Sequence, residues 1–474
     1  MDMGEVVIKA DNLSFNYKES KEGIHNNSFE IKRGEVILLT GNSGSGKSTL
    51  LKCLNGLIPE IQEGDISGDI TINGQEYNKL KMFELNKDIG SVFQNPRSQF
   101  FTDESTAELV FPMENYGYSK EEMQARLDKL IRAFSLEKVI GRNIFTLSSG
   151  ERQKLALATS LTLDQKVLLF DEPSANLDYG NAMKLGLTIR ELRDKGLTII
   201  VSDHRFFYLN GIIDKVLFMD SGNLKIYESE EEFKNGDYNT RSFDLFEINT
   251  PFKKEKETYE TVASMKDVSY KDILKDINID FNKGETTVIV GSNGAGKTTL
   301  AKLLCKTYKP DKGKINEKGL PFFIMQDPDY QLFGTSVHNE LTIVKKDEER
   351  INKLLEKFGL KEYKHTHPFD LSGGQKQRLQ IAMAMLCDKE VIIFDEPTSG
   401  LDVTSMQRVS GEICSLSENA AVLVISHDYE FIRNVADRIV YIDEGTVKED
   451  FMLNSETVLR LNSIFTKMEE AACK

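Results

Sequence analysis

The sequence lacks the features that mark membrane-spanning and exported proteins. No apolar run approaches the roughly 18 residues that a membrane-spanning helix requires. The longest candidates, residues 36–39 and 391–394, have the length of strands. The first residues, Met-Asp-Met-Gly-Glu, contain neither the basic stretch nor the apolar segment of a signal peptide. We therefore expect a chain that stays in the cytoplasm unless a partner holds it at a membrane.

Positive charge and paired cysteines are also scarce. The chain has 60 Lys and Arg against 75 Asp and Glu, a net charge of -15. Proteins that bind DNA or RNA draw much of their affinity from basic side chains that neutralise phosphates, so this balance disfavours a nucleic-acid partner. The five cysteines form no C-x-x-C pair, which disfavours a zinc site and indicates reduced, structural thiols.

What the chain does contain is an internal repeat. The segment from Gly41 to Thr49 recurs in similar form from Gly291 to Thr299. Residues 147–151 recur at 371–375, and the apolar run ending in Asp-Glu-Pro at 168–173 recurs at 392–397. Because 474 residues are too many for one compact core, the repeat predicts two domains, residues 1–228 and 263–474, joined by a linker over 229–262.

The pattern within each copy predicts an α/β fold. Residues 36–39, 167–170 and 198–201 are short apolar runs typical of buried parallel strands. They alternate with amphipathic stretches, one of which begins after Gly150, so we expect a mostly parallel sheet with helices. Residues 118–145 and 347–363 are expected to form helical inserts. In the charged linker, four apolar residues predict partial packing on a domain: Phe233, Phe243, Leu245 and Phe246.

The repeated glycine-rich segment fits the pattern G-x-x-x-x-G-K-[S/T] of a phosphate-binding loop. Its backbone N–H groups and the following helix N-terminus favour phosphate. A glycine-rich turn without function is the alternative, but both copies follow a predicted strand and open a predicted helix. The residues expected to bind ATP are Gly41, Asn42, Ser43, Gly44, Ser45, Gly46, Lys47, Ser48 and Thr49, and Gly291, Ser292, Asn293, Gly294, Ala295, Gly296, Lys297, Thr298 and Thr299.

In each copy, two carboxylates stand directly after an apolar run, at 167–170 in the first copy and at 391–394 in the second. Asp171 and Asp395 are expected to hold Mg²⁺ together with the hydroxyls of Ser48 and Thr298. The next residues, Glu172 and Glu396, are placed to polarise the attacking water as general bases. A lone Asp-Glu pair is usually only a strand end that meets solvent, but here a phosphate-binding loop precedes it in both copies.

The motif Leu-Ser-Gly-Gly-Gln at 371–375 resembles the signature of the ATP-binding cassette (ABC) superfamily. His204 and His427 resemble the family's switch histidines, and Gln94 and Gln326 resemble its Q-loop glutamines, further expected Mg²⁺ ligands. The resemblance implies two P-loop NTPase nucleotide-binding domains in tandem. Each would have a RecA-like core, an antiparallel β subdomain and a helical subdomain.

The resemblance also implies that the two domains close head to tail, so that ATP lies between one domain's phosphate loop and the other's signature. The expected sets are Lys47, Glu172 and His204 with Ser372 and Gly374, and Lys297, Glu396 and His427 with Ser148 and Gly150. Tyr17 would stack on adenine in the first copy. In the second copy, Tyr270 aligns with either Tyr17 or Phe15.

The first signature departs from the family pattern. Ser149 stands where the pattern has glycine, and Glu151 where it has glutamine. Serine restricts a backbone position where glycine is freer, and the glutamate brings negative charge towards phosphate. We therefore expect the site served by this signature to be the weaker one.

The residues after the Q-loop glutamines indicate the kind of ABC protein. The pattern Gln-x-Pro-x-x-Gln followed by two apolar residues occurs at 94–101 and 326–333. It is similar to the ATPases of energy-coupling factor (ECF) transporters, which import vitamins, their precursors and transition-metal ions. The resemblance implies that Phe101 and Phe333 are exposed and dock helices of a transmembrane subunit, with a separate substrate-binding membrane subunit, at the inner face of the cell membrane. The alternative is that both phenylalanines are core residues.

Other tandem cassettes remain as alternatives. A ribosome-associated translation factor would carry a longer, helical and strongly charged linker. A DNA-repair ATPase would need zinc-ligand cysteines or a long coiled coil. In the double ATPase of a sugar importer one nucleotide site is often degraded, whereas both copies here retain the Lys, Asp, Glu and His of the motifs.

Overall fold

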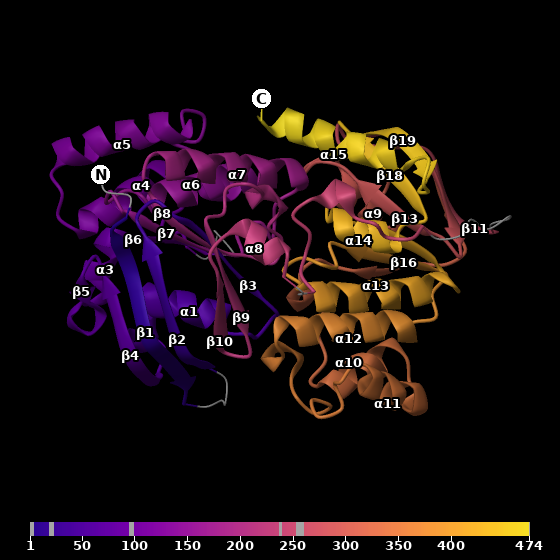
Figure 1. Ribbon diagram of the computed structural model, residues 1–474. Coiled ribbons are helices and arrows are strands. Elements are labelled where there is room, and N and C mark those ends of the chain that lie inside the picture. Colours follow the sequence, from indigo (N-terminus) through magenta and orange to yellow (C-terminus); the bar gives the residue numbers. More distant parts are fainter. Residues whose placement is uncertain (1–3, 19–22, 94–98, 237–238, 253–259, 474) are drawn as a thin grey trace. The chain divides into compact units, whose positions relative to one another are not determined.

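The protein is described from a computed structural model, which covers residues 4–18, 23–93, 99–236, 239–252 and 260–473. Contacts divide the chain into two compact units (Figure 1). The first comprises Met1–Leu177 and Asn181–Phe243, and the second comprises Asp178–Gly180 and Asp244–Lys474. In the described part of the chain, no helix combines the length and apolar character needed to cross a membrane.

The first unit contains two sheets. An antiparallel sheet has the order β2-β1-β4-β5, and a second sheet has the order β10-β9-β3-β8-β7-β6, parallel except for β10. The three runs predicted as buried parallel strands are β3, β7 and β8, so that prediction is confirmed. The strands are β1 (Val6–Tyr17), β2 (Gly23–Lys32), β3 (Val36–Gly41), β4 (Gly64–Ile72), β5 (Gln75–Glu76), β6 (Ile89–Val92), β7 (Val167–Asp171), β8 (Thr198–Ser202), β9 (Lys215–Asp220) and β10 (Asn223–Tyr227).

The helices of the first unit alternate along the chain with the strands, and one of them lies in the predicted helical insert 118–145. Helix α5 lies within the expected helical segment 118–145, and α6 begins at Ser149, two residues before the predicted start. The helices are α1 (Lys47–Leu54), α2 (Leu57–Glu60), α3 (Met82–Asp88), α4 (Ser105–Asn115), α5 (Lys120–Phe134), α6 (Ser149–Thr159), α7 (Tyr179–Asp194) and α8 (Glu230–Lys234).

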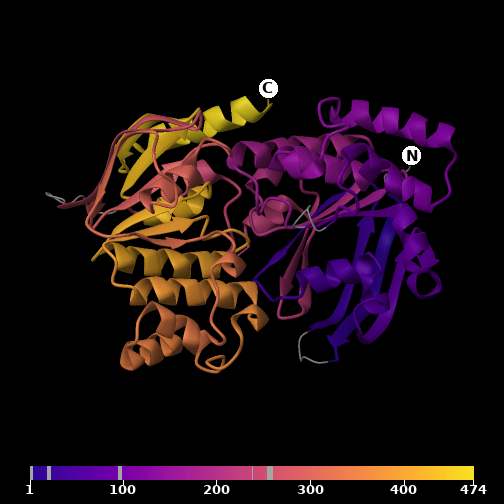
Figure 2. The ribbon, with the colours of Figure 1, turned by 180° about the vertical axis from the view of Figure 1, so that it is seen from behind.

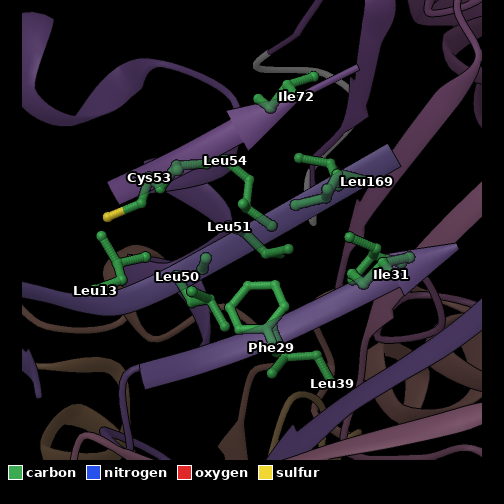
Figure 3. Close-up of a cluster of buried hydrophobic side chains, with 14 of the residues drawn as sticks. Leu13, Phe29, Ile31, Leu39, Leu50, Leu51, Cys53, Leu54, Ile72 and Leu169 are labelled. Carbon is green, nitrogen blue, oxygen red and sulfur yellow. The ribbon is translucent and has the colours of Figure 1, made fainter. Parts of the chain in front are cut away.

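A core between the two sheets fixes the first helix after the phosphate loop. Leu50, Leu51 and Leu54 of α1 pack with Phe29 of β2 and Leu39 of β3, all at most 4% exposed (Figure 3). The apolar residues of α1 are spaced so that one face of the helix is buried. The start of α1 is therefore held rigidly at the end of β3, where the phosphate loop lies.

The second unit repeats this architecture. A three-stranded antiparallel sheet has the order β12-β11-β14, and a six-stranded sheet has the order β15-β16-β17-β13-β18-β19, parallel except for β19. The strands are β11 (Glu260–Tyr270), β12 (Leu274–Lys283), β13 (Thr286–Val290), β14 (Lys312–Glu317), β15 (Phe322–Ile324), β16 (Val391–Asp395), β17 (Ala421–Ile425), β18 (Arg438–Asp443) and β19 (Thr446–Met452).

Four helices of the second unit, α10 to α13, pack on one another and can be followed in Figures 1 and 2. Helix α11 lies within the predicted insert 347–363. The helices are α9 (Lys297–Leu304), α10 (Val337–Val344), α11 (Glu348–Lys357), α12 (Gly373–Leu386), α13 (Val403–Ser417), α14 (Tyr429–Val435) and α15 (Val458–Cys473).

The expected linker packs on both units. Phe233 and Phe243 are buried in the first unit, where the Phe243 ring lies 4.5 Å from that of Phe206. Leu245 is buried in the second unit, and the half-exposed Phe246 ring meets the Tyr429 ring edge-on at 5.4 Å. The prediction that these apolar residues anchor the linker is confirmed, although Phe246 keeps 40% of its surface exposed.

Candidate functional site

The two phosphate loops have the same local geometry. Each connects a parallel strand, β3 or β13, to the helix that follows it. The helices begin after Gly46 and Gly296, whose φ angles of 107° and 101° lie in the left-handed region. A side chain there would also collide with Ile24 or Leu274, at 2.8 and 2.6 Å from its Cβ. These positions therefore require glycine.

Each loop lysine lies against its own loop. The Lys47 ammonium donates to the carbonyls of Gly41 and Asn42, both at 2.9 Å. Lys297 donates to Gly291 and Ser292 at 2.6 and 3.0 Å, and its burial lowers the pKa of the ammonium group. A desolvated cation beside a helix N-terminus is suited to bind phosphate.

The loop hydroxyls and the strand-end carboxylates meet in both units. The Thr298 hydroxyl donates to Asp395 Oδ2 at 2.8 Å, and the Ser48 hydroxyl donates to Asp171 Oδ1 at 3.4 Å. Burial, with Glu396 nearby, raises the pKa of Asp395 to about 6. A hydroxyl and a carboxylate are the hard oxygen donors that Mg²⁺ takes beside nucleotide phosphates, so these residues fit the ion. Among the described residues, no group of three or more Asp, Glu, His or Cys side chains is arranged to hold a metal ion by itself.

The predicted bases and histidines also lie together. His427 Nδ1 lies 2.7 Å from Glu396 Oε1, and His204 Nε2 lies 3.6 Å from Glu172 Oε1. Both glutamates have left-handed backbone angles, with φ of 45° for Glu172 and 48° for Glu396. Non-glycine residues adopt this region rarely, and mostly where the surrounding structure holds them there. The backbone thus turns sharply after each strand to present the glutamate.

A buried carboxylate beside the first site was not predicted. Asp203 is 2% exposed and accepts hydrogen bonds from Tyr208 Oη at 2.8 Å and from the N–H of Arg205 at 3.0 Å. Burial raises the pKa of Glu172 to about 8, and the negative charge of Asp203 adds to the rise. The corresponding residue before His427 is Ser426. The two sites therefore differ in electrostatics at the base itself.

Each signature serine begins a helix. The hydroxyls of Ser148 and Ser372 accept from the N–H groups of Glu151 and Gln375, at 3.3 and 3.4 Å. The side chains of Glu151 and Gln375 in turn accept from the serine N–H groups, both at 2.8 Å. Glutamate and glutamine therefore complete the same capping box. Glu151 also pairs with Arg142 at 3.1 Å, and its hydrogen bonds lower its pKa.

The structure gives no support to the backbone argument for unequal sites. Ser149 is the first residue of α6, and its counterpart Gly373 is the first residue of α12. A Cβ added at Gly373 would meet nothing within 4 Å, and the backbone there is not left-handed. The second unit therefore does not require glycine at this place, and the charge of Glu151 becomes the stronger reason for asymmetry at the signature.

The second glutamine of each Gln-x-Pro-x-x-Gln motif closes the loop onto its strand. Gln331 accepts from Met325 N–H at 3.1 Å and donates to the Phe323 carbonyl at 2.6 Å. Gln99 accepts from Phe93 N–H and donates to the Ser91 carbonyl, both at 3.1 Å. Gln94 lies outside the described residues, and Gln326 is exposed two residues after β15.

Two buried glutamates, which the sequence analysis missed, hold the residues that follow. Glu108 is 1% exposed and accepts from the N–H groups of Phe101 and Thr102 at 3.0 and 2.9 Å. Glu340, 2% exposed, accepts from Phe333 N–H at 2.9 Å and from Gly334 N–H. Each glutamate lies seven positions after its phenylalanine, and this repeated spacing is the signal that could have found them.

The phenylalanines themselves point outward. Phe101 is 78% exposed and Phe333 is 80% exposed, so the alternative that they are core residues is wrong. The ring of Phe101 stacks on that of Phe111 at 5.1 Å. Ile343 takes the place of Phe111 in the second unit and is also exposed. Each unit therefore displays apolar side chains on a loop that is fixed from inside.

The expected adenine-stacking residue lies beside the first phosphate loop. Tyr17 Oη lies 3.0 Å from Thr49 Oγ1, and its ring meets Phe15 edge-on at 4.9 Å. In the second unit, Tyr270 pairs with Leu274 as Phe15 pairs with Ile24, and it stacks on Tyr308 at 5.2 Å. Tyr270 thus corresponds to Phe15, and the stacking role of Tyr17 stays a prediction.

Within each unit the structure brings the phosphate loop, the Asp-Glu pair and the histidine to one edge of a parallel sheet. This arrangement defines a P-loop nucleotide hydrolase, present twice in the chain. A family model described as ABC transporter matches residues 24–175 and again 274–399. The chain belongs to this family of ATP-binding proteins and is an ATPase with two ABC cassettes in tandem.

Relatives and solved structures agree with this assignment. A Treponema denticola protein provisionally named an ABC transporter ATP-binding protein is 38% identical over 494 residues, covering 97% of this chain and 99% of the relative. A Bacillus subtilis protein provisionally named the HMP/thiamine import ATP-binding protein YkoD is 30% identical, covering 94% and 91%. The archaeal ribosome recycling factor aABCE1 has a TM-score of 0.67 at 24% identity, covering 96% and 92%, which shows the fold alone.

The hydrogen bonds that buried Glu340 accepts from the loop that carries Phe333 can be tested by mutation. We expect Glu340→Ala to leave the N–H groups of Phe333 and Gly334 without their buried acceptor, at a cost of about 1–3 kcal/mol. Hydrogen exchange of the peptide spanning residues 325–336 should become faster. Glu348→Ala, at an exposed helix position, is the control and should leave that peptide unchanged. Equal exchange in both variants would contradict this role of Glu340.

Proposed function

We propose that this ATPase energises a membrane importer of the energy-coupling factor type, for a vitamin, a vitamin precursor or a metal ion. The observation that carries the proposal is the loop that presents Phe101 in the first unit and Phe333 in the second. In both units a glutamine bonds this loop to the preceding strand, and a buried glutamate accepts hydrogen bonds from its backbone. The protein would act in the cytoplasm at the inner face of the membrane. Its partners would be a transmembrane subunit and a separate substrate-binding membrane subunit.

A fixed loop with an exposed aromatic side chain suits a partner helix. Its backbone is already ordered, so binding loses little conformational entropy, and the ring supplies apolar area at the interface. Proteins of the ABC transporter family generally work with transmembrane subunits, and the similarity to a relative provisionally named for HMP/thiamine import favours an importer. The aABCE1 likeness carries no argument for a ribosomal role, because it extends to the fold alone.

For hydrolysis we propose two composite sites between cassettes limited to residues 1–228 and 263–474, with 229–262 as the linker. Each phosphate loop would work with the signature of the other cassette. The sets are Lys47, Glu172 and His204 with Ser372 and Gly374, and Lys297, Glu396 and His427 with Ser148 and Gly150.

Within each site, Glu172 or Glu396 would accept the proton of the attacking water, and its histidine would orient it. Mg²⁺, held by Ser48 and Asp171 or by Thr298 and Asp395, would neutralise charge on the phosphates. Gln94 and Gln326 are proposed as additional ligands.

Removing both proposed bases should separate binding from turnover. We expect Glu172→Gln combined with Glu396→Gln to keep ATP binding but to lower the hydrolysis rate by at least about 100-fold, the scale of general-base catalysis. Phosphate release and nucleotide binding are the measurements. The exposed glutamates Glu191 of α7 and Glu418, directly after α13, serve as controls when changed to Gln. Near-normal turnover of the double variant would remove both residues from the general-base role.

The docking proposal is tested by placing charge on the exposed rings. With the membrane partners coexpressed, Phe101→Asp combined with Phe333→Asp should reduce the membrane-bound fraction by about tenfold, equivalent to about 1.4 kcal/mol. Leu187→Asp with Leu459→Asp is the matched control, because both leucines are exposed at 46% and 72%. ATPase activity of the purified chain should survive in both.

Two results would contradict the docking proposal. One is unchanged membrane association of the phenylalanine variant, which would place the docking surface elsewhere. The other is RNA-dependent sedimentation with ribosomes, which would favour a translation factor. Copurification in mild detergent with the subunits of a sugar importer would keep the transport function but overturn the energy-coupling factor type.

The proposed pairing of sites makes the charge of Glu151 testable. In a Lys47→Ala background, turnover depends on the site of Lys297 and the first signature. There, Glu151→Gln should raise turnover by about threefold, or about 0.7 kcal/mol, the size expected of a solvent-screened charge. Ser149→Gly should leave turnover unchanged. A rise with Ser149→Gly as large as that with Glu151→Gln would reinstate the backbone argument.

A further inference from the structure

The antiparallel sheet of the second unit ends in an open edge. Its order is β12-β11-β14, whereas in the first unit β5 pairs with the outer side of β4. Among the described residues of the second unit, no strand pairs with β14 on its outer side. Only residues 318–321 separate β14 from the next strand, β15, whereas residues 73–88 lie between β4 and β6. The second copy therefore lacks the segment that covers this edge in the first copy.

Matching glycines show how the two edges correspond. Gly68 and Gly313 have left-handed φ angles of 85° and 82°, and each lies at an irregularity in the strand pairing. They set an offset of 245 (313 − 68) between β4 and β14. Lys314 therefore stands where the first copy has Asp69.

Two residues of β14 present their backbone to the open edge. In an antiparallel ladder, the N–H and C=O groups of successive residues point to opposite sides of the strand. The N–H of Lys318 donates to the Val262 carbonyl at 3.0 Å, so the backbone of this residue faces β11. By alternation, Ile315 and Glu317 direct their N–H and C=O groups away from β11. An open row of such groups is a template for an added strand.

A cavity of about 410 Å³ runs along the open edge. Four consecutive residues of β14, 313–316, line it, although successive side chains of a strand point to opposite faces. The cavity therefore lies beside the strand and not over one face of the sheet. The rest of its wall comes from the end of α9 and the residues that follow, among them Leu303, Tyr308 and Pro310. Residues 291–299 of the phosphate loop are not part of the lining, so this cavity is distinct from the nucleotide site.

The first copy fills the corresponding place itself. Its strand β5 pairs with Thr71 and Ile72 of β4. Tyr77, the residue after β5, is 5% exposed and donates from its hydroxyl to the Ile58 carbonyl at 2.5 Å. Ile58 corresponds to Tyr308 at the offset of 250 that relates the two phosphate loops. A short strand and a buried tyrosine thus occupy in the first copy the place that is a cavity in the second.

The open edge is basic. Lys309, Lys312 and Lys314 are exposed, and within the described parts of the chain no carboxylate pairs with any of them. Lys306 also lines the cavity, but it pairs with Glu317 and so contributes no unpaired charge. Three exposed ammonium groups are therefore available to a ligand at this edge.

The first copy has the opposite charge at this place. Residues 59–69 contain four acidic and no basic side chains, whereas residues 309–314, which take their place, contain three lysines and one acidic residue, Asp311. The Asp311 carboxylate accepts from the N–H of Lys271 at 2.6 Å. A net positive edge on a chain whose net charge is -15 favours an acidic ligand.

Backbone groups and charge together identify the kind of occupant. A polypeptide offers the alternating N–H and C=O groups that pair with an open strand, which a lipid headgroup or an inorganic anion does not. A second copy of the chain adding through the same edge would place lysines opposite lysines, which is unfavourable. An acidic strand with an aromatic residue matches the open backbone, the lysines and the apolar part of the cavity wall.

We propose that β14 binds an acidic segment of a partner protein, which adds to the three-stranded sheet as a further strand and places an aromatic side chain in the cavity. The backbone groups of Ile315 and Glu317 hold the strand, and Lys309, Lys312 and Lys314 select its acidic side chains. The site does not depend on the transport function proposed above.

The probe is a fluorescein-labelled peptide, Glu-Asp-Gln-Glu-Tyr-Asp-Glu, whose middle repeats β5 and the tyrosine after it. Its anisotropy is measured with the whole chain, with ADP and Mg²⁺ saturating both phosphate loops. Lys309→Glu combined with Lys314→Glu should weaken binding by about tenfold or more, equivalent to about 1.4 kcal/mol. The matched control, Lys353→Glu with Lys361→Glu, makes the same charge change at lysines that are both 71% exposed, and should change the dissociation constant less than about twofold. Absent binding to the unaltered chain, or equal effects of the two double variants, would overturn the proposal.

A second measurement tests the added strand through the peptide, with the protein unaltered. Because alternate N–H groups of an added strand face β14, methylating one alternate set of peptide nitrogens should abolish binding, whereas methylating the other set should not. Replacing the peptide's tyrosine with alanine should weaken binding by about fivefold or more, because the ring then no longer fills the cavity. Equal losses from the two methylated sets, or unchanged binding without the ring, would contradict the proposal. A dimer of the chain that excess peptide dissociates, measured by sedimentation, would assign the edge to a second copy and would also overturn it.

Discussion

The hydrogen bond between a loop hydroxyl and a strand-end carboxylate is the contact on which each site depends. In the second unit, β13 and β16 both pair with β17 in parallel, so their carboxyl ends share one edge of the sheet. Thr298 follows the first strand and Asp395 ends the second, and their side chains meet at 2.8 Å. Glu396, the next residue, has a left-handed backbone conformation. It therefore cannot continue the strand, and its side chain is directed to the same edge of the sheet.

The two copies keep this geometry but differ in charge around it. Asp203 stands where the second unit has Ser426, and this carboxylate raises the pKa of Glu172 further than burial alone would. The ring nitrogens of the histidines also approach their glutamates differently, at 3.6 Å from His204 and 2.7 Å from His427. A duplicated fold therefore supplies two sites with the same residues and unequal electrostatics, independently of the signature motifs.

The sequence predicted what depends on local pattern. Strands such as β3 and β7 were found because continuous apolar runs are typical of strands buried on both faces. The phosphate loops were found because glycine positions at fixed spacing dictate the backbone. Glu108 and Glu340 were missed because a glutamate within an amphipathic helix looks like a solvated residue until tertiary structure buries it. The expectation that serine restricts the backbone at 149 lost its support because the motif alone does not show that this position begins a helix.

The loop that carries Phe101 or Phe333 contacts the helix after the signature, α6 or α12, through different side chains in the two units. In the second, Gln380 of α12 donates to Gln331 Oε1 at 3.2 Å, and Lys376 pairs with Asp329 at 2.6 Å, so polar contacts join the loop to the helix. In the first unit Ala156 takes the place of Gln380 and offers no such bond. There Phe100, beside the exposed Phe101, packs against the cluster that contains Leu155 and Ala158 of α6. Hydrogen bonds fix a geometry, whereas apolar packing tolerates small shifts, so among the described residues the loop of the second unit is tied to its helix by the more directional contacts.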